Sequence, residues 1–147
     1  MKTVKEVMRT QVPTISPSES LKKATEVMKH EKTGGLAVMD GGRLVGIITD
    51  GDILNAFYLN VSAFSYEEKL EGSHNGAFKK RVEEFRNTTV GEVMTPHPRT
   101  ISENATVDEA ASIIKRFKIK RVIAVNNNGE PVGMVERLNV VDSILGV

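Results

Sequence analysis

The pentapeptide Val4-Lys5-Glu6-Val7-Met8 returns along the chain as Val90-Gly91-Glu92-Val93-Met94, at an offset of 90 − 4 = 86 residues. Further landmarks follow both copies in the same order, and Gly46 returns as Gly133 with one extra residue in between. Self-similarity at a fixed spacing is the sequence signature of a repeated structural unit. The chain is therefore predicted to hold two copies of one unit, because several matched landmarks in order rarely arise by chance.

Both copies show the same alternation of strand and helix patterns. A short apolar strand precedes a helix whose apolar residues recur at helical spacing. Two strands joined by a tight turn follow, and a second helix closes the copy. This order predicts an α/β (α+β) fold, with two units in a pseudo-two-fold arrangement and two helices on one face of each three-stranded sheet. The predicted organisation is residues 1–57 for the first unit, 58–88 for a helical insert or linker, and 89–147 for the second unit.

The insert has a different pattern from either copy. Its aromatic residues Phe64, Phe78 and Phe85 lie among charged residues, which is typical of amphipathic helices. Two short helices are predicted around a break at Ser73-His74-Asn75-Gly76. A lid over a binding site, a dimer contact and a solvated linker are the alternatives for the role of this segment.

Composition argues against several classes of protein. The 147 residues carry 20 basic and 19 acidic side chains, and this balance argues against a general nucleic-acid-binding surface. Cysteine is absent, and the three histidines (His30, His74 and His97) lie far apart in the sequence, so no metal site is predicted. No apolar run approaches the roughly 20 residues that span a bilayer, and the first residues lack an apolar signal region. We expect a soluble, cytoplasmic protein without membrane contact, and we find no catalytic constellation in the sequence.

The stretch Gly46-Ile47-Ile48-Thr49-Asp50-Gly51-Asp52 is predicted to hold a strand that runs directly into a helix. Thr49 would be the N-cap residue, and Asp52 would lie in the first turn. Exposed N–H groups at a helix start favour anions, whereas a carboxylate there suits the hydroxyl pair of a ribose. The alternative is that Thr49 and Asp52 form a capping pair that binds no ligand.

The duplication, the Val-x-x-Val-Met opening and the Gly-x-x-Thr-x-x-Asp segment together resemble a tandem pair of CBS domains (cystathionine β-synthase domains), also called a Bateman module. The resemblance covers residues 3–57 and 89–147 and leaves out the insert. It implies a non-catalytic regulatory protein, with no required cofactor. Such a protein would sense an adenosine nucleotide (AMP, ADP or ATP) or S-adenosylmethionine in a cleft between its units and signal to a partner protein. The resemblance also implies a homodimer whose contact uses the last helix of each unit, at Ile53, Leu54, Phe57, Val141, Ile144 and Leu145.

The resemblance further assigns ligand-binding residues one by one. The Thr49 hydroxyl would contact phosphate, the Asp52 carboxylate the ribose, and Ile47 one side of the base. The basic residues Lys120 and Arg121, just before the second strand of the other copy, would clamp the phosphate. Two residues at the first strand of that copy would face the adenine mainly through their backbone. The predicted ligand-binding residues are Ile47, Thr49, Gly51, Asp52, Pro98, Arg99, Lys120 and Arg121.

The second copy departs from the motif at two positions. Glu136 stands where the threonine is expected, and Asn139 where the aspartate is expected. Glu136 would repel phosphate, and Asn139 lacks the charge that raises a hydrogen bond to ribose from about 1 kcal/mol to about 1.5–3 kcal/mol. One occupied nucleotide site per chain is therefore predicted. One alternative is a dimerisation scaffold with a vestigial site. The other, against the evidence of the net charge, is a nucleic-acid-binding module that uses the basic segments Lys79-Lys80-Arg81 and Lys115 to Lys120.

Overall fold

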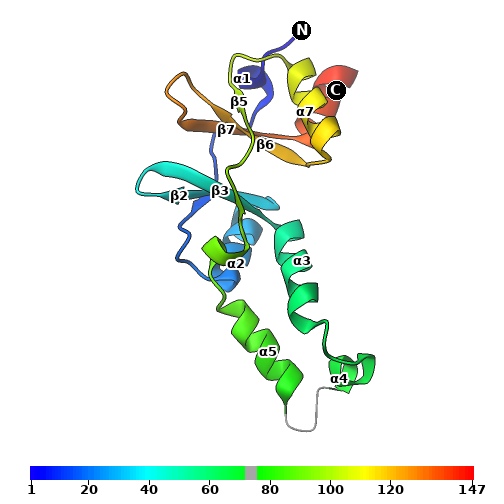
Figure 1. Cartoon of the computed structure of the whole chain (residues 1–147). Coiled ribbons are helices and arrows are strands. Elements are labelled where there is room, and N and C mark those ends of the chain that lie inside the picture. The colour runs from blue at the N-terminus through cyan, green and yellow to red at the C-terminus, as the bar shows by residue number, and fades with distance from the viewer. Residues whose placement is uncertain (72–75) are drawn as a thin grey trace. The chain divides into compact units, whose positions relative to one another are not determined.

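The computed structural model describes residues 1–71 and 76–147, and Figure 1 shows how the chain runs through them. Helices and strands alternate in both repeats, so the predicted mixed α and β class is confirmed. Within these residues the strands form two small sheets. The break predicted at Ser73-His74-Asn75 lies outside the described residues.

The first repeat follows the predicted order of elements (Figure 1). Its first three strands are neighbours in one sheet, and the first is parallel to the second. The turn between the second and third strands has Gly41 and Gly42 at φ values of 57° and 80°, which a type I′ turn requires at both central positions. The elements are β1 (Thr14–Ile15), α2 (Leu21–Glu31), β2 (Gly35–Asp40), β3 (Arg43–Thr49) and α3 (Asp50–Val61).

The second repeat has the same order of elements. Its first two strands are parallel, and the second pairs antiparallel with the third. The turn between the last two holds the extra residue of this repeat, and the Asn126 side-chain oxygen accepts hydrogen bonds there from the Asn128 and Glu130 N–H groups, both at 3.0 Å. The elements are β5 (Thr100–Ser102), α7 (Val107–Phe117), β6 (Arg121–Val125), β7 (Pro131–Glu136) and α8 (Arg137–Leu145).

The opening segment of each repeat packs with the other repeat. The Val4 N–H, at the start of α1 (Val4–Val7), donates to the Ala105 carbonyl at 2.8 Å. The Val90 N–H, at the start of α6 (Val90–Val93), donates to the Glu19 carbonyl at the same distance. The second opening segment continues as β4 (Thr95–Pro96), which pairs antiparallel with β3. One sheet therefore has four strands where three were predicted, because this segment occupies the edge that β3 would otherwise leave open.

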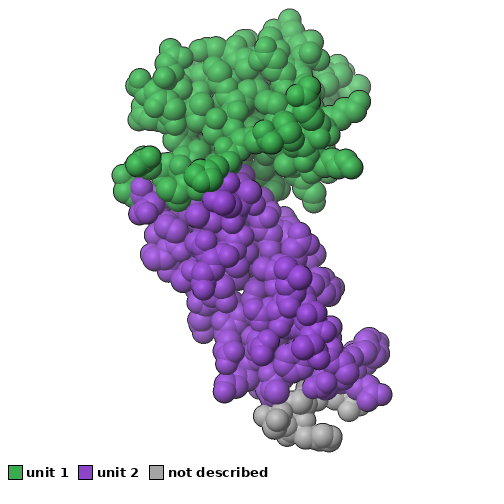
Figure 2. Space-filling model, viewed as in Figure 1, with its two compact units in different colours: residues 1–12, 41–45, 97–147 green, residues 13–40, 46–96 purple. Residues whose placement is uncertain are grey.

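Two compact units result, and neither is one continuous piece of chain (Figure 2). Unit 1 consists of residues 1–12, 41–45 and 97–147, and unit 2 of residues 13–40 and 46–96. The predicted domains at 1–57 and 89–147 are contiguous, whereas these units are interleaved along the chain. The exchange is visible in the core of unit 1, where Val4 is fully buried among residues of the second repeat. That core consists of Val4, Ile101, Val107, Ala110, Ile114, Val122, Ala124, Val135 and Val140.

The methionine at the end of each opening segment packs closely against a glycine of a strand, Met94 against Gly46 and Met8 against Gly133. Met94 lies so close to Gly46 that a Cβ on this glycine would be 2.6 Å from the methionine Sδ and 2.9 Å from the Thr95 carbonyl oxygen. In unit 1, Met8 crowds Gly133 in the same way. Approaches of this kind leave no room for a side chain, so each Val-x-x-Val-Met opening has a matching glycine on the strand against which it packs.

The helices α2 and α7 each bury one apolar face, as their helical spacing predicts. The Ser20 hydroxyl caps α2 by accepting from the Lys23 N–H at 3.0 Å, and the Thr106 hydroxyl caps α7 by accepting from the Glu109 N–H at 3.2 Å. The caps fix where each helix begins and therefore which residues face the sheet. The buried residues are Leu21, Ala24 and Met28 on α2 and Val107, Ala110 and Ile114 on α7.

Carboxylates cap the two short opening helices. The Thr3 N–H and hydroxyl donate to Glu6 at 2.7 and 3.1 Å, and the same groups of Thr89 donate to Glu92, both at 2.9 Å. These hydrogen bonds, the backbone one above all, lower the pKa of both glutamates from the ordinary value of 4.5. A carboxyl whose pKa is lowered on folding stabilises the protein above its unfolded pKa, and that contribution is lost as the pH falls through the folded pKa.

We therefore expect the melting temperature to fall as the pH is lowered from about 5 to about 3, and the double variant Glu6→Gln/Glu92→Gln to lose part of this dependence. The difference between the two proteins will be small, because both carboxyls lie at the surface, where water screens their interactions. Differential scanning calorimetry at a series of pH values measures it. Parallel curves for the variant and the parent protein would show that these caps do not contribute.

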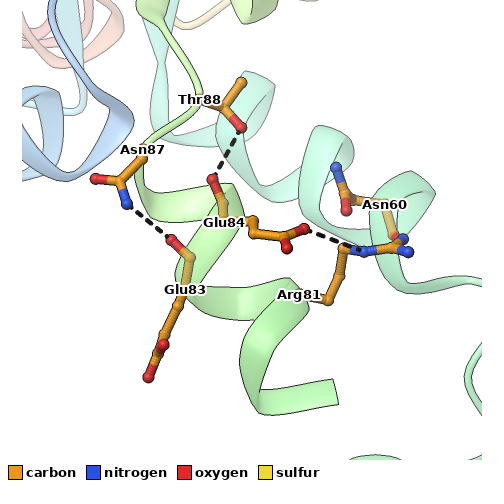
Figure 3. A network of polar contacts seen from close by, with 6 residues as sticks. All are labelled: Asn60, Arg81, Glu83, Glu84, Asn87 and Thr88. Carbon is orange, nitrogen blue, oxygen red and sulfur yellow. Dashed lines mark hydrogen bonds and ion pairs between the residues drawn. The ribbon is translucent and has the colours of Figure 1, made fainter. Parts of the chain in front are cut away.

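The insert forms α4 (Tyr66–Glu71) and α5 (Ala77–Arg86), and α5 packs against α2 and α3 within unit 2. The Arg81 guanidinium joins α5 to α3, because it donates to the Asn60 carbonyl at 2.9 Å, and it also pairs with Glu84 at 3.9 Å (Figure 3). The same guanidinium lies over the Phe64 ring, which contacts the Phe78 ring edge-on. These contacts favour an ordered helical segment over a solvated linker.

Candidate functional site

The predicted motif lies in unit 2, where β3 runs directly into α3. Thr49 is the N-cap residue of α3, and its hydroxyl accepts a hydrogen bond from the Asp52 N–H at 3.0 Å. The Asp52 carboxylate accepts one in return from the Thr49 N–H at 3.1 Å. The two residues therefore form the reciprocal capping box that the sequence offered as the alternative to a ligand site. Both residues are only half-buried, so a solute can still reach them.

Thr95 is a third member of this group, which sequence reasoning missed. Its hydroxyl donates to the second oxygen of the Asp52 carboxylate at 3.3 Å. Thr95 reaches Asp52 because β4 pairs with β3 in a register that sets Thr95 opposite Ile47. The repeated Val-x-x-Val-Met segment could have indicated Thr95. Thr95 directly follows Met94, so it must lie beside the strand on which that methionine packs. Asp52 thus accepts hydrogen bonds at both oxygens.

Two other predicted residues flank this group. Ile47 is half-buried on β3 beside the fully buried Ile48, as expected where neighbouring side chains point to opposite faces of a sheet. Gly51 lies in the exposed first turn of α3, and its N–H donates to the Asp50 carboxylate at 2.8 Å. The Asp50 N–H donates to the Gly34 carbonyl at 2.9 Å. The first N–H groups of α3 are thus partly engaged within the chain.

In unit 1, Pro98 and Arg99 lead into β5. The Arg99 guanidinium stacks on Phe117, at the end of α7, with its Cζ 3.3 Å from the ring centroid. Phe117 is still 36% exposed, and a cation–π contact at such a site is worth about 0.5–1 kcal/mol. Arg99 was predicted to act mainly through its backbone, and the sequence did not suggest this side-chain contact.

The predicted cations Lys120 and Arg121 also belong to unit 1. The Lys120 carbonyl accepts a hydrogen bond from the Arg137 N–H at 2.8 Å, which holds this residue beside the start of α8. Arg121 begins β6 and lies directly opposite Glu136 on β7, so a negative charge stands across the ladder from it. Lys120 is exposed and Arg121 is half-buried, so Lys120 is the more accessible of the two to a phosphate.

The second motif keeps the capping geometry of the first and changes its chemistry. Glu136 is the N-cap residue of α8, and its N–H donates to the Asn139 side-chain oxygen at 2.8 Å, as Thr49 does to Asp52. The residue equivalent to Thr95 is Arg9, whose backbone pairs with β7. Unit 1 thus presents a carboxylate and a neutral amide where unit 2 presents a hydroxyl and a carboxylate.

The predicted ligand-binding residues divide between the units. Ile47, Thr49, Gly51 and Asp52 belong to unit 2, and the other four belong to unit 1. Within the described residues, no group of three or more histidine, aspartate or glutamate side chains is placed to hold a metal ion. Across residues 1–71 and 76–147, no helix has both the length and the apolar character needed to cross a bilayer.

A family model for the CBS domain matches residues 4–59 and 90–146. The chain therefore belongs to the CBS-domain family, and it carries two copies of the domain in tandem, as its internal repeat indicated.

Solved structures of CBS pairs match nearly the whole chain. CBSX2 from Arabidopsis thaliana, whose structure was determined in complex with AMP, is 26% identical, with a TM-score of 0.73 over 99% of this chain and 98% of its own. The CBS-domain structure of NE2398 is 24% identical, with a TM-score of 0.77 over 99% of both chains. The second comparison shows a shared fold.

Longer relatives match over part of their length. A probable arabinose 5-phosphate isomerase from Haemophilus influenzae is 32% identical over 133 residues, which are 90% of this chain. The chloroplastic CBS-domain protein CBSX1 from Arabidopsis thaliana is 27% identical over 140 residues, also 90% of this chain. The chain spans only 33% of the first protein and 59% of the second, so the matches concern the CBS pair.

Proposed function

We propose that this protein is a non-catalytic regulatory module that binds an adenosine-containing ligand, AMP in the first instance. The observation that carries the proposal is the group of Thr49, Asp52 and Thr95 at the start of α3. It is supported by the 26% identity over nearly the whole chain to CBSX2, a protein whose structure contains AMP.

The chemistry of this group suits a ribose. Two neighbouring ribose hydroxyls are donors, and the Asp52 carboxylate has about four lone-pair directions, of which Thr49 and Thr95 use two. The Thr49 hydroxyl and the start of α3 favour a phosphate nearby. The cations Lys120 and Arg121 of unit 1 would complete the binding of the phosphate. Pro98 and Arg99 would line the adenine together with Ile47, and Gly51 would let the ligand approach the backbone.

Ligand binding would act on a partner protein by changing which conformations of the chain are populated. A ligand shifts the population toward the conformation that it binds more tightly, by its difference in affinity for the alternatives. A partner protein that recognises that conformation would then respond to the nucleotide level, which is a form of energy sensing.

We expect isothermal titration with AMP to give one site per chain. The Glu136 carboxylate would repel a phosphate, and Asn139 offers the ribose only a neutral hydrogen bond. The second motif should therefore bind AMP at least about tenfold more weakly than the first motif does. S-adenosylmethionine, which carries no phosphate, is the comparison ligand for the same titration. Two equal sites per chain for AMP would contradict the one-site proposal and would leave adenosine binding itself in place.

A scaffold with a vestigial site is the second candidate, and the complete capping box between Thr49 and Asp52 favours it, because this box needs no ligand. A thermal-shift screen with AMP, ADP, ATP, S-adenosylmethionine and a short DNA duplex separates the candidates. A rise with one adenosine compound supports a sensor, because a ligand that binds only the folded state stabilises it. No rise with any compound favours the scaffold, and a salt-sensitive rise with the duplex favours nucleic-acid binding.

We propose that the protein is a homodimer whose self-contact uses the last helix of each unit, α3 and α8; on α8, Val141, Ile144 and Leu145 are 42%, 62% and 69% exposed. Two of the residues expected on α3, Ile53 and Phe57, instead face α5 of their own unit, where Ile53 lines a hollow with Phe85 and Phe57 touches the Phe85 ring. The outer side of α3 remains apolar, with Leu54 56% and Tyr58 61% exposed. Neutral apolar surface of this kind on a helix is typical of subunit contacts.

The double variant Leu54→Glu/Tyr58→Glu is therefore expected to be a monomer at concentrations where the parent protein is a dimer, because four carboxylates would enter one symmetric contact. Asn127→Glu, in the exposed turn between β6 and β7, is the control and should leave the dimer intact. Sedimentation velocity measures both. A dimer that survives the double variant would place the contact elsewhere.

A further inference from the structure

Exposed apolar side chains gather along one stretch of unit 2, from the outer side of α3 to the end of α4. Beyond Leu54 and Tyr58, the stretch continues with Leu59, Tyr66 and Leu70, which are 80%, 75% and 66% exposed. A single exposed leucine is ordinary on a protein surface, whereas a run of large apolar side chains is typical of a surface that a partner covers. We call these five residues the α3–α4 surface.

The same stretch carries no charge. The 14 residues from Ile53 to Tyr66 include no lysine, arginine, histidine, aspartate or glutamate, although charged residues make up 27% of the chain. A stretch of this length ordinarily holds three or four charged residues, at a usual share of about 25%. Its exposed polar positions include Asn55 and Ser62, which are neutral. Depletion of charged residues distinguishes the core of a protein–protein interface from the rest of a protein surface.

Local contacts fix which side of α4 faces outward. At the start of α4, the Ser65 hydroxyl accepts from the Glu68 N–H at 3.2 Å, and the Glu68 carboxylate accepts from the Ser65 N–H at 3.1 Å. Just before this cap, Phe64 packs edge-on against an aromatic ring of α5. Tyr66 and Leu70 are four residues apart, so they lie on one face of the helix. That face is the one turned to solvent.

The other insert helix, α5, covers a different part of unit 2. It runs back beside α3 and lies on the groove between α2 and α3 (Figure 1). Its Phe85 is only 7% exposed and contacts the Phe57 ring at 5.6 Å between centroids. The apolar anchor of α5 is therefore buried within the unit, whereas the residues of the chain that the structure describes leave the α3–α4 surface open to another molecule.

A second copy of this chain is the occupant that fits. The α3–α4 surface offers no charge that would select a charged partner, and two neutral copies do not repel each other. A stable contact also buries about 800 Å² on each side, contributed by about 20–30 residues. The outer side of α3 supplies only a few of these residues. The exposed face of α4 extends the same apolar surface from Leu54 to Leu70.

We propose that α4 is part of the homodimer contact, with Tyr66 and Leu70 packed on the α3–α4 surface of the second copy. This inference rests on the homodimer proposed above. It carries the contact past residue 59, where the first match to the CBS domain ends, so the insert adds a contact of its own. In a contact with two-fold symmetry, the same surface serves on both copies.

Sedimentation equilibrium of the full chain over a dilution series measures the dissociation constant of the dimer. Tyr66→Ser/Leu70→Ser should raise this constant about tenfold or more, because it removes two large apolar side chains from the contact. Lys79→Ser/Lys80→Ser is the matched control, since it changes two exposed residues of α5, and it should change the constant less than about twofold. Circular dichroism confirms that both variants are folded.

A single thiol tests the burial of α4 directly. The chain contains no cysteine, so Leu70→Cys and Lys79→Cys each introduce one. Alkylation of Leu70→Cys by iodoacetamide should be at least about fivefold slower at concentrations that give the dimer than at those that give the monomer, because the contact shields the thiol. Lys79→Cys should react at the same rate in both forms.

The outcomes separate this inference from the homodimer on which it rests. A parent protein that is monomeric at every concentration overturns both. If the parent protein is a dimer whose dissociation constant Tyr66→Ser/Leu70→Ser leaves unchanged, α4 is not part of the contact and the homodimer stands. If the Leu70→Cys thiol reacts equally fast in both forms, α4 stays open in the dimer, which also overturns the inference.

Discussion

Replacing Asp52 with alanine is expected to weaken AMP binding about ten- to a hundredfold, which corresponds to the loss of about 1.5–3 kcal/mol for a charge-assisted hydrogen bond. The carboxylate is the only charged group in the Thr49–Asp52–Thr95 group, and its two oxygens already accept from a backbone N–H and a hydroxyl. In the variant, the ribose hydroxyls of AMP no longer have a carboxylate to which they can donate hydrogen bonds. Isothermal titration of AMP at a temperature where both proteins are folded measures the change.

Two controls make that result specific. Asp52→Ala also removes the hydrogen-bond partner of the Thr49 N–H, which costs about 1 kcal/mol of stability, so a thermal melt must accompany each titration. Asp52→Asn keeps the capping oxygen and loses only the charge, and it should show a smaller loss of affinity. Asn139→Ala changes the position in unit 1 that corresponds to Asp52, and it should leave the AMP affinity unchanged. An unchanged affinity in Asp52→Ala would falsify the assignment of Asp52 to the ribose.

Gly46→Ala is expected to lower stability by about 1–3 kcal/mol, the usual cost of forcing extra volume into a well-packed core. The new Cβ would stand 2.6 Å from the Met94 Sδ and 2.9 Å from the Thr95 carbonyl oxygen, and the second of these is backbone that cannot rotate away. A chain of this length should lose about 2–4 °C in melting temperature for each kcal/mol. Because the clash pushes on Thr95, which donates to Asp52, AMP binding should also weaken.

Gly51→Ala is the matched control for that variant. A Cβ on Gly51 would meet only the Thr49 hydroxyl, at 3.6 Å, and alanine is a better helix former by about 0.5–1 kcal/mol. Its melting temperature should therefore rise slightly. Adding Met94→Ala to Gly46→Ala should restore part of the lost stability, since it removes the sulfur but leaves the carbonyl. If thermal melts show Gly46→Ala as stable as the parent protein, the close approach of the opening segment has no energetic weight.

Local signals were sufficient for much of this molecule. Three features depend on neighbours within a few residues: the spacing of apolar residues in α2 and α7, the cap at Thr106, and the glycines of the first hairpin turn. Such features can be read directly from the sequence. The capping box of Thr49 and Asp52 is equally local, and it was predicted with both of its interpretations. The family followed from the repeat, which is a property of the sequence alone.

The sequence by itself determined the duplicated architecture, the class of fold and the residues at the start of α3, because these are set by periodicity and short-range hydrogen bonding. Only the tertiary structure decided that the opening segments pack with the other repeat, that Thr95 donates to Asp52 from 43 residues away, and that Phe85 covers the α2–α3 groove. Those contacts join residues that are distant in the chain. Which of these long-range contacts form depends on which apolar surfaces remain uncovered once each sheet has formed. A local sequence pattern does not contain this information.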